Sequence, residues 1–159
     1  MDLILWRHAY ARRIDNPELV NDESDLAREL TPRGHAQAKA SAKWLRRHLS
    51  ASTKVLCSPA IRCQETAAYL EMDVRLVDRL KPSANASDIL DVAKWPECKS
   101  PVLVVGHQPA LGEVLAQLLQ CSAGATSVRK SGIWWLRHRV RDGVGQTTVV
   151  TVVSPDMVV

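Results

Sequence analysis

The sequence has no phenylalanine, and aromatic residues make up only 4% of its 159 positions. Surfaces that bind single-stranded nucleic acid usually stack bases on aromatic rings, so this scarcity argues against a nucleic-acid partner. The adjacent Trp134 and Trp135 lie in an alternating apolar stretch, which favours core packing over base stacking. No apolar run approaches the roughly 20 residues that cross a bilayer, and we therefore expect no membrane partner.

Paired cysteines are missing as well. Cys57, Cys63, Cys98 and Cys121 are scattered, without a C-x-x-C pair and without a nearby histidine at the spacing of metal ligands. We therefore predict reduced, mostly buried thiols, no metal and no other cofactor. The apolar stretch at the N-terminus is too short for the core of a signal peptide, so the cytoplasm is the expected location.

Neither sign of charge dominates the chain. There are 21 lysines and arginines against 17 aspartates and glutamates, which gives a net charge of +4. The basic residues form no long run, apart from a small group at 137–141. A solvated surface accounts for most of them, so the charge alone selects no function.

Short apolar runs alternate with helical stretches along most of the chain. The apolar runs are rich in valine, leucine and isoleucine, which is typical of strands that are buried on both faces. The strand-like runs cover 3–6, 54–57, 74–77 and 101–106, and the helical stretches cover 31–49, 58–71, 86–95 and 109–120. We predict a single α/β domain over residues 1–159, with a mostly parallel central sheet and helices on both faces. Stretches 131–140 and 147–153 flank a glycine-containing turn and predict a C-terminal antiparallel hairpin.

Three of the predicted helices begin with recognisable signals. Thr31 and Ser58 are favourable N-caps that are each followed by proline, and Pro109 can open its helix in the same way. The polar segment 12–30 has no such pattern and is interpreted as a loop, whose length indicates a functional role.

Cationic and imidazole side chains follow three of the four predicted parallel strands. Arg7 and His8 follow the first strand, Arg62 lies in the first turn of the helix after the second, and His107 follows the fourth. The carboxyl ends of parallel strands lie along one edge of a sheet, so we expect these side chains to converge there. Two arginines, two imidazoles and nearby helix N-termini suit a small dianion, for which a phosphoryl group is the best fit.

The motifs around these residues resemble those of the histidine phosphatase superfamily. The motifs are "RHAYA" at 7–11, "LTPRG" at 30–34, "CSPAIRCQETA" at 57–67 and "VVGHQP" at 104–109. The small size and the pattern D-x-x-R-x-LT-x-x-G over 25–34 are most similar to the SixA-type phosphohistidine phosphatases of that superfamily. The resemblance implies the phosphoglycerate mutase-like α/β fold, which agrees with the sheet predicted above.

The resemblance also implies roles for five side chains. It makes His8 the nucleophile and places Arg7, Arg62 and His107 in the phosphate pocket. Neutral His8, favoured by the neighbouring arginines, would attack phosphorus to give a phospho-His8 intermediate that water hydrolyses. His107, when protonated, would join the arginines in stabilising the transferred group. Arg28 matches an arginine of the family pattern and is predicted to bind substrate, although pairing with a nearby acid is an equally good interpretation.

The segment after the third predicted strand departs from many members of the superfamily, which carry a carboxylic acid there as proton donor. Lys81 and Pro82 stand where such a motif belongs, and the flanking Asp78 and Asp88 are in no recognisable donor motif. Phosphoester cleavage gains much from a donor, whereas an imidazole leaves more easily from phosphohistidine. The sequence therefore favours P–N over P–O cleavage, unless segment 12–30 brings an acid over the site.

Three functions remain open at this point. The favoured one is a phosphatase that removes phosphate from histidine in a signalling or phosphotransfer protein. The second is a phosphomonoesterase that acts on phosphorylated small molecules with the same nucleophile. The third is a non-catalytic module that binds phosphate or nucleic acid through its basic surface. The sequence does not fix the oligomeric state, and a monomer is compatible with it.

Overall fold

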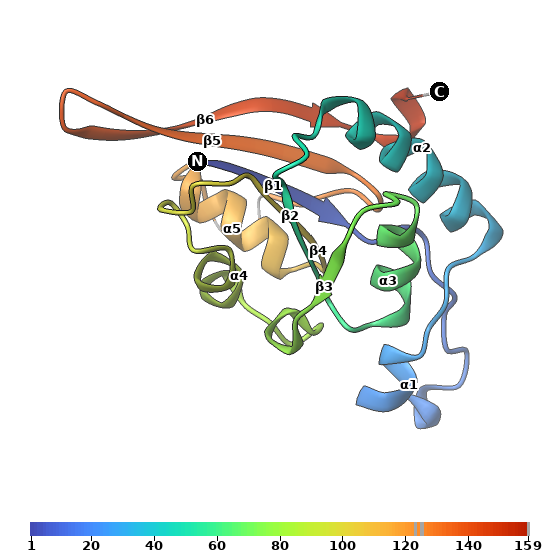
Figure 1. Cartoon of the computed structure of the whole chain (residues 1–159). Helices are drawn as coiled ribbons and strands as arrows, with labels where there is room; N and C mark the ends of the chain where they lie inside the picture. Colours follow the sequence, from blue (N-terminus) through green and yellow to red (C-terminus); the bar gives the residue numbers. More distant parts are fainter. Residues whose placement is uncertain (123, 125, 159) are drawn as a thin grey trace.

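The computed structural model describes residues 1–122, 124 and 126–158. In this part of the chain a six-stranded sheet has the strand order β3-β2-β4-β1-β5-β6 (Figure 1). The strands are β1 (Asp2–Arg7), β2 (Lys54–Cys57), β3 (Val74–Leu76), β4 (Val102–Gly106), β5 (Ile133–Arg141) and β6 (Val144–Val153). The pairings among β1 to β4 are parallel, and β5 and β6 join as antiparallel strands. The predicted mostly parallel sheet with a C-terminal antiparallel hairpin is confirmed.

Helices cover both faces of the sheet, as predicted. They are α1 (Asp22–Leu26), α2 (Pro32–His48), α3 (Ile61–Ala68), α4 (Ala86–Ala93) and α5 (Ala110–Leu118). In β1, Ile4 and Trp6 pack with residues of α2 and α3, whereas Leu3 and Leu5 pack with residues of α4 and α5. Figure 1 shows α2 and α3 on one side of the sheet and α4 and α5 on the other. All four side chains are buried. Because both faces of the central strands enter a core, the buried positions of β1 and β4 are all apolar, which explains the continuous apolar runs.

The start of α2 is held tightly against the segment that follows β1. Thr31 is the N-cap of α2, as predicted, and its hydroxyl accepts a hydrogen bond from the Gly34 amide at 3.1 Å. The Thr31 amide donates to the Tyr10 carbonyl at 2.9 Å. A Cβ on Gly34 would overlap that same carbonyl oxygen, so only glycine fits there. The "LTPRG" motif therefore fixes the position of the chain just beyond β1.

The other two predicted helix starts are displaced. α3 begins at Ile61, and its N-cap Ala60 offers no side-chain hydrogen bond, so the prediction of Ser58 as N-cap is wrong. The Ser58 hydroxyl instead contacts His107, as described below. Pro109 is the N-cap of α5 and not its first helical residue.

Segment 12–30 contains regular structure that the sequence analysis missed. A short 3-10 helix, η1 (Pro17–Leu19), precedes α1, and Asn21 caps α1 in a reciprocal pair of hydrogen bonds with Ser24. The ends of the segment are tied together by the Arg12 amide, which donates to the Glu29 carbonyl at 2.8 Å. A five-residue helix leaves too short a pattern for its period to be recognised. The interpretation of the whole segment as a loop is corrected accordingly.

The C-terminal hairpin turns over two residues only. Asp142 and Gly143 both have positive φ, at 51° and 76°, as a type I′ turn requires. The strands therefore run further than predicted, and the hairpin projects beyond the other strands (Figure 1). Trp135 is buried and Trp134 packs against the α4 and α5 side, which agrees with the predicted packing role. Among the described residues, no helix is long and apolar enough to cross a membrane.

Candidate active site

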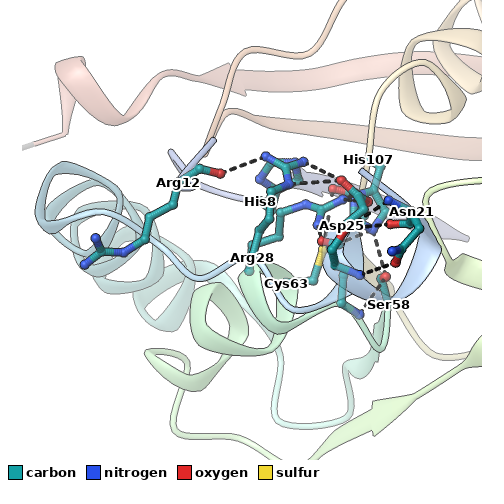
Figure 2. Close-up of polar contacts among 12 residues, drawn as sticks. His8, Arg12, Asn21, Asp25, Arg28, Ser58, Cys63 and His107 are labelled. Carbon is teal, nitrogen blue, oxygen red and sulfur yellow. Dashed lines mark hydrogen bonds and ion pairs between the residues drawn. The ribbon is translucent and has the colours of Figure 1, made fainter. Parts of the chain in front are cut away.

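The predicted side chains meet at the carboxyl edge of the parallel strands. β4 lies between β1 and β2, so the chain segments that leave these three strands are neighbours. The His8 amide donates to the Gly106 carbonyl at 3.1 Å, and the Ser58 amide donates to the Val105 carbonyl at 3.0 Å. These backbone bonds extend the strand pairing past the end of the sheet. They bring side chains from distant parts of the sequence into one place (Figure 2).

A cavity of about 290 Å³ opens at this edge. All five sequence-predicted site residues line it. The lining residues are Arg7, His8, Ala11, Arg13, Asp25, Arg28, Arg62, Pro82, His107, Gln108 and Lys130. The cavity is rich in cations, which suits an anionic ligand.

His8 is buried and has one free ring nitrogen. Its Nδ1 lies 2.7 Å from the Ala9 carbonyl oxygen, which can only accept, so Nδ1 carries the proton. The remaining nitrogen, Nε2, then has a lone pair. Burial lowers the pKa of His8 well below its usual range, and the neighbouring His107, Arg62 and Arg7 lower it further. The ring is therefore neutral and can act as a nucleophile at neutral pH.

Two arginines lie beside this ring, of which Arg62 is buried and Arg7 is partly buried. Arg7 Nη1 donates to the Val128 carbonyl at 2.9 Å, and Arg62 Nη1 donates to the Asp25 carbonyl at 2.6 Å. The Nε atoms of both arginines are buried and have no hydrogen-bond partner within the described chain. A buried donor without a partner costs free energy. Both arginines line the cavity, where their positive charges suit an anionic ligand.

His107 is held between Ser58 and Arg62. Arg62 Nη2 lies 3.3 Å from His107 Nδ1, and an arginine can only donate, so Nδ1 accepts. His107 Nε2 then carries the proton and donates to the Ser58 hydroxyl at 2.7 Å. Burial, aided by the charge of Arg62, lowers the pKa of His107 to about 3. The hypothesis that His107 contributes as a cation is corrected: in this structure its ring is a neutral hydrogen-bonding group at pH 7.

Asp25 is the site residue to which the sequence analysis gave no role. Its Oδ2 accepts from Arg62 Nη2 at 3.0 Å, and its Oδ1 pairs with Arg28 at 2.9 Å. Burial raises the pKa of Asp25, but the hydrogen bonds and charges of Arg62 and Arg28 outweigh burial, and the net shift is downward. An acid from segment 12–30 therefore does reach the site, and it is ionised. One signal was available, because Asp25 opens the family pattern that contains Arg28.

Arg28 pairs with an acid, as one of its two interpretations predicts, and its role in substrate binding stays a prediction. It pairs with Asp25, and its Nη1 donates to the Arg12 carbonyl at 3.0 Å. It also lines the cavity, so its guanidinium lies within the site.

The acids of the segment after β3 stay outside the cavity. Asp88 belongs to the cap of α4 and pairs with Arg79, and Asp78 pairs with Lys81. Only Pro82 of this segment lines the cavity. In the described chain, Asp25 is therefore the single acid among the lining residues.

The thiols and acids of the structure offer no other reactive centre at this edge. Cys63 Sγ lies 3.5 Å from His107 Nε2, but burial raises the pKa of the Cys63 thiol to about 12. All four cysteines are free; Cys57 and Cys63 are buried, whereas Cys121 is exposed, so the prediction of mostly buried thiols is only half correct.

In the part of the chain that the structure describes, no group of three or more His, Cys, Asp or Glu side chains is placed to hold a metal ion.

Comparison with known proteins identifies the family. The model of the histidine phosphatase superfamily (branch 1) matches residues 3–83. A phosphohistidine phosphatase SixA homolog from Haemophilus influenzae is 34% identical over 134 residues, which cover 74% of this chain and 77% of that protein. The chain belongs to the histidine phosphatase superfamily.

Solved structures of superfamily proteins share the whole fold with this member. A SixA protein from Nakamurella multipartitia has a TM-score of 0.71 at 28% identity, over 97% of this chain and 95% of that one. A phosphoserine phosphatase from Entamoeba histolytica has a TM-score of 0.68 at 19% identity, over 96% of each chain. The second likeness concerns the fold alone, and the fold alone therefore does not select the substrate.

Proposed function

We propose that this protein is a phosphohistidine phosphatase that carries the phosphoryl group covalently on His8. The observation that supports this most directly is the His8 ring, which is buried, neutral and left with a free Nε2 beside two arginines. The relationship to a SixA homolog supports the substrate class.

The proposed reaction has two displacements at phosphorus. His8 Nε2 attacks phosphorus, the bond from phosphorus to the leaving nitrogen breaks, and the electron pair of that bond stays on the leaving ring. Water then attacks phospho-His8, releases inorganic phosphate and returns the His8 ring to its neutral form. Arg7 and Arg62, which both line the cavity, stabilise the charge on the phosphoryl oxygens through their guanidinium groups. Arg28 contributes to binding at the cavity mouth.

The ionised state of the acid in the cavity supports P–N cleavage over P–O cleavage. An ester oxygen leaves well only when a positioned acid protonates it, whereas the ring of phosphohistidine brings its own proton on the far nitrogen. The single acid of the cavity, Asp25, is ionised through Arg62 and Arg28, so it is a poor proton donor.

A trapping experiment tests the nucleophile. The parent protein is mixed with a phosphohistidine peptide, quenched within one turnover and mapped by mass spectrometry. We expect phosphate on His8 in the parent, and neither trapped phosphate nor turnover in His8→Ala. The control is His48→Asn, which changes an exposed histidine on α2 and should behave as the parent. Turnover of His8→Ala at the parent rate would remove His8 as the nucleophile.

A small-molecule phosphomonoesterase is the second candidate. The cavity of about 290 Å³ is close to the size of sites that hold small molecules and favours it, and the fold shared with a phosphoserine phosphatase is compatible with it. Rates on a phosphohistidine peptide are therefore compared with rates on sugar, nucleotide and serine phosphates. A preference for the esters would overturn the substrate class and leave the nucleophile in place.

We further propose that residues 1–159 form one histidine phosphatase domain whose partner is a phosphohistidine-bearing protein of the cytoplasm. The single sheet, which runs from β1 to β6, supports the domain proposal. Four free cysteines are in keeping with a reducing compartment.

A further inference from the structure

Burial divides the cavity into a floor and a mouth. His8, Arg62 and His107 are only 7%, 2% and 4% exposed, which places them at the floor, where the strands end. The side chains of Asp25 and Arg28 are 28% and 24% exposed, which places them nearer the solvent, at the mouth. In an in-line displacement the leaving atom lies opposite the nucleophile. A group attacked by His8 from the floor therefore leaves toward the mouth, where Asp25 lies.

Asp25 is held firmly at that mouth. Its carbonyl oxygen accepts from Arg62 Nη1 and its Oδ2 accepts from Arg62 Nη2. The buried Arg62 side chain of α3 therefore binds both the backbone and the carboxylate of Asp25. Its Oδ1 accepts from Arg28 Nε at 2.9 Å. Arg28 Nη2 also lies 2.9 Å from Oδ1, so three contacts with arginine nitrogens hold the carboxylate in position and keep it ionised.

The charged surroundings of Asp25 are otherwise mostly cationic. Most of the titratable and charged groups that line a cavity with Asp25 or contact it are cations or imidazoles, and Asp22 is the one acid among them; they are Arg7, His8, Arg13, Asp22, Arg28, Arg62, Lys81, His107 and Lys130. Without Asp25, the mouth would present cations to the leaving group.

We propose that Asp25 is the specificity-determining residue that makes this site select P–N over P–O bonds, an inference that rests on the proposed function. The protonated far nitrogen of phosphohistidine carries positive charge, which a fixed carboxylate attracts, and the ring leaves neutral when the P–N bond breaks. An ester oxygen instead gains negative charge as the P–O bond breaks, and the same carboxylate repels it. One ionised side chain thus favours the first substrate and opposes the second.

A purely structural role for Asp25 makes a different prediction. If the carboxylate only held Arg62 in place, its loss would weaken binding of every phosphoryl group and slow both reactions alike. The ratio of the two rates therefore separates selectivity from positioning.

The test uses Asp25→Asn, whose amide oxygen can still accept from Arg62 while the charge is gone. We measure kcat/KM on two peptides of one sequence, phosphorylated on histidine in the first and on serine in the second. The ratio of P–N to P–O cleavage should fall by about tenfold to a hundredfold in Asp25→Asn. Glu23→Gln is the matched control, because it removes one negative charge from an exposed position of the same helix and should keep the parent ratio.

The outcomes distinguish this inference from the proposed function. A parent protein that traps no phosphate on His8 would overturn the proposed function and this inference with it. A parent that traps phosphate, combined with an Asp25→Asn ratio within twofold of the parent, would overturn only the role of Asp25. An equal loss of both activities would do the same, since it shows positioning without selectivity.

Discussion

Arg62 contacts two other residues of the site, Asp25 and His107. Its guanidinium bonds the Asp25 carbonyl and carboxylate and reaches His107, while its Nε stays without a partner in the described chain. Removing one well-placed donor to a transition state costs about 3 kcal/mol, or two to three decades in rate. Arg62→Ala should therefore lower kcat on a phosphohistidine peptide by about a hundredfold to a thousandfold.

The control for this prediction is Arg75→Ala, which removes an exposed arginine from β3. It should turn over substrate as the parent does. An Arg62→Ala protein that stays folded by circular dichroism and keeps kcat within threefold of the parent would contradict the role given to Arg62.

Topology explains which site residues the sequence reveals. Arg7, His8, Arg62 and His107 follow or adjoin the ends of parallel strands, and those ends meet in any sheet of this type. The contact between Asp25 and Arg62 depends instead on how α1 packs over α3, which no local pattern encodes. The protonation of His107 was also beyond sequence reasoning, because burial and the nearby Arg62 decide it.

At the scale of elements, the start of α2 is the most constrained junction near the site. Gly34 packs against the Tyr10 carbonyl, which leaves no room for a Cβ. Gly34→Ala would force the helix away from the chain that leaves β1, and overpacking of this kind typically costs about 1–3 kcal/mol. We expect that loss in the free energy of unfolding measured by urea denaturation. Lys39→Ala, at an exposed position of the same helix, should unfold as the parent does.

Element prediction succeeded where periodicity and capping agreed, and failed where a side chain had another partner. Thr31 caps α2 because its hydroxyl meets the Gly34 amide, and the sequence pattern predicts that bond. Ser58 has the same chemistry before a proline, but its hydroxyl accepts from His107 and α3 begins later. The missed α1 is too short for a periodic pattern, and its stability comes from the Asn21 cap and from Asp25.

At the scale of the whole molecule, two buried neutral histidines make stability depend on pH. Burial and Arg62 lower the pKa of His107 to about 3 in the folded protein, below the value near 6.5 of an exposed histidine. Between these two pH values the unfolded chain therefore binds more protons than the folded protein. The contribution of neutral His107 to the free energy of unfolding is complete above about pH 6.5 and is lost as the pH falls toward 3. His8, whose pKa is also lowered, acts in the same direction.

Urea denaturation at pH 7 and at pH 4.5 measures this effect. His107 alone should remove about 2–3 kcal/mol from the free energy of unfolding over that interval. His107→Asn should show a correspondingly smaller loss, because its side chain takes up no proton. Equal losses in the parent and the variant would show that His107 does not titrate as described.

The residue register between β1 and β4 determines whether the site can form. Trp6 pairs with Val105 and Arg7 with Gly106, so one register between β1 and β4 sets the positions of both the core residue Trp6 and the cavity residue Arg7. A slip of one residue would send Trp6 to the opposite core and turn His8 away from Arg62. Enzymatic turnover is for that reason a sensitive reporter of native strand alignment, and misaligned conformers in a preparation would be counted as inactive protein in an active-site titration.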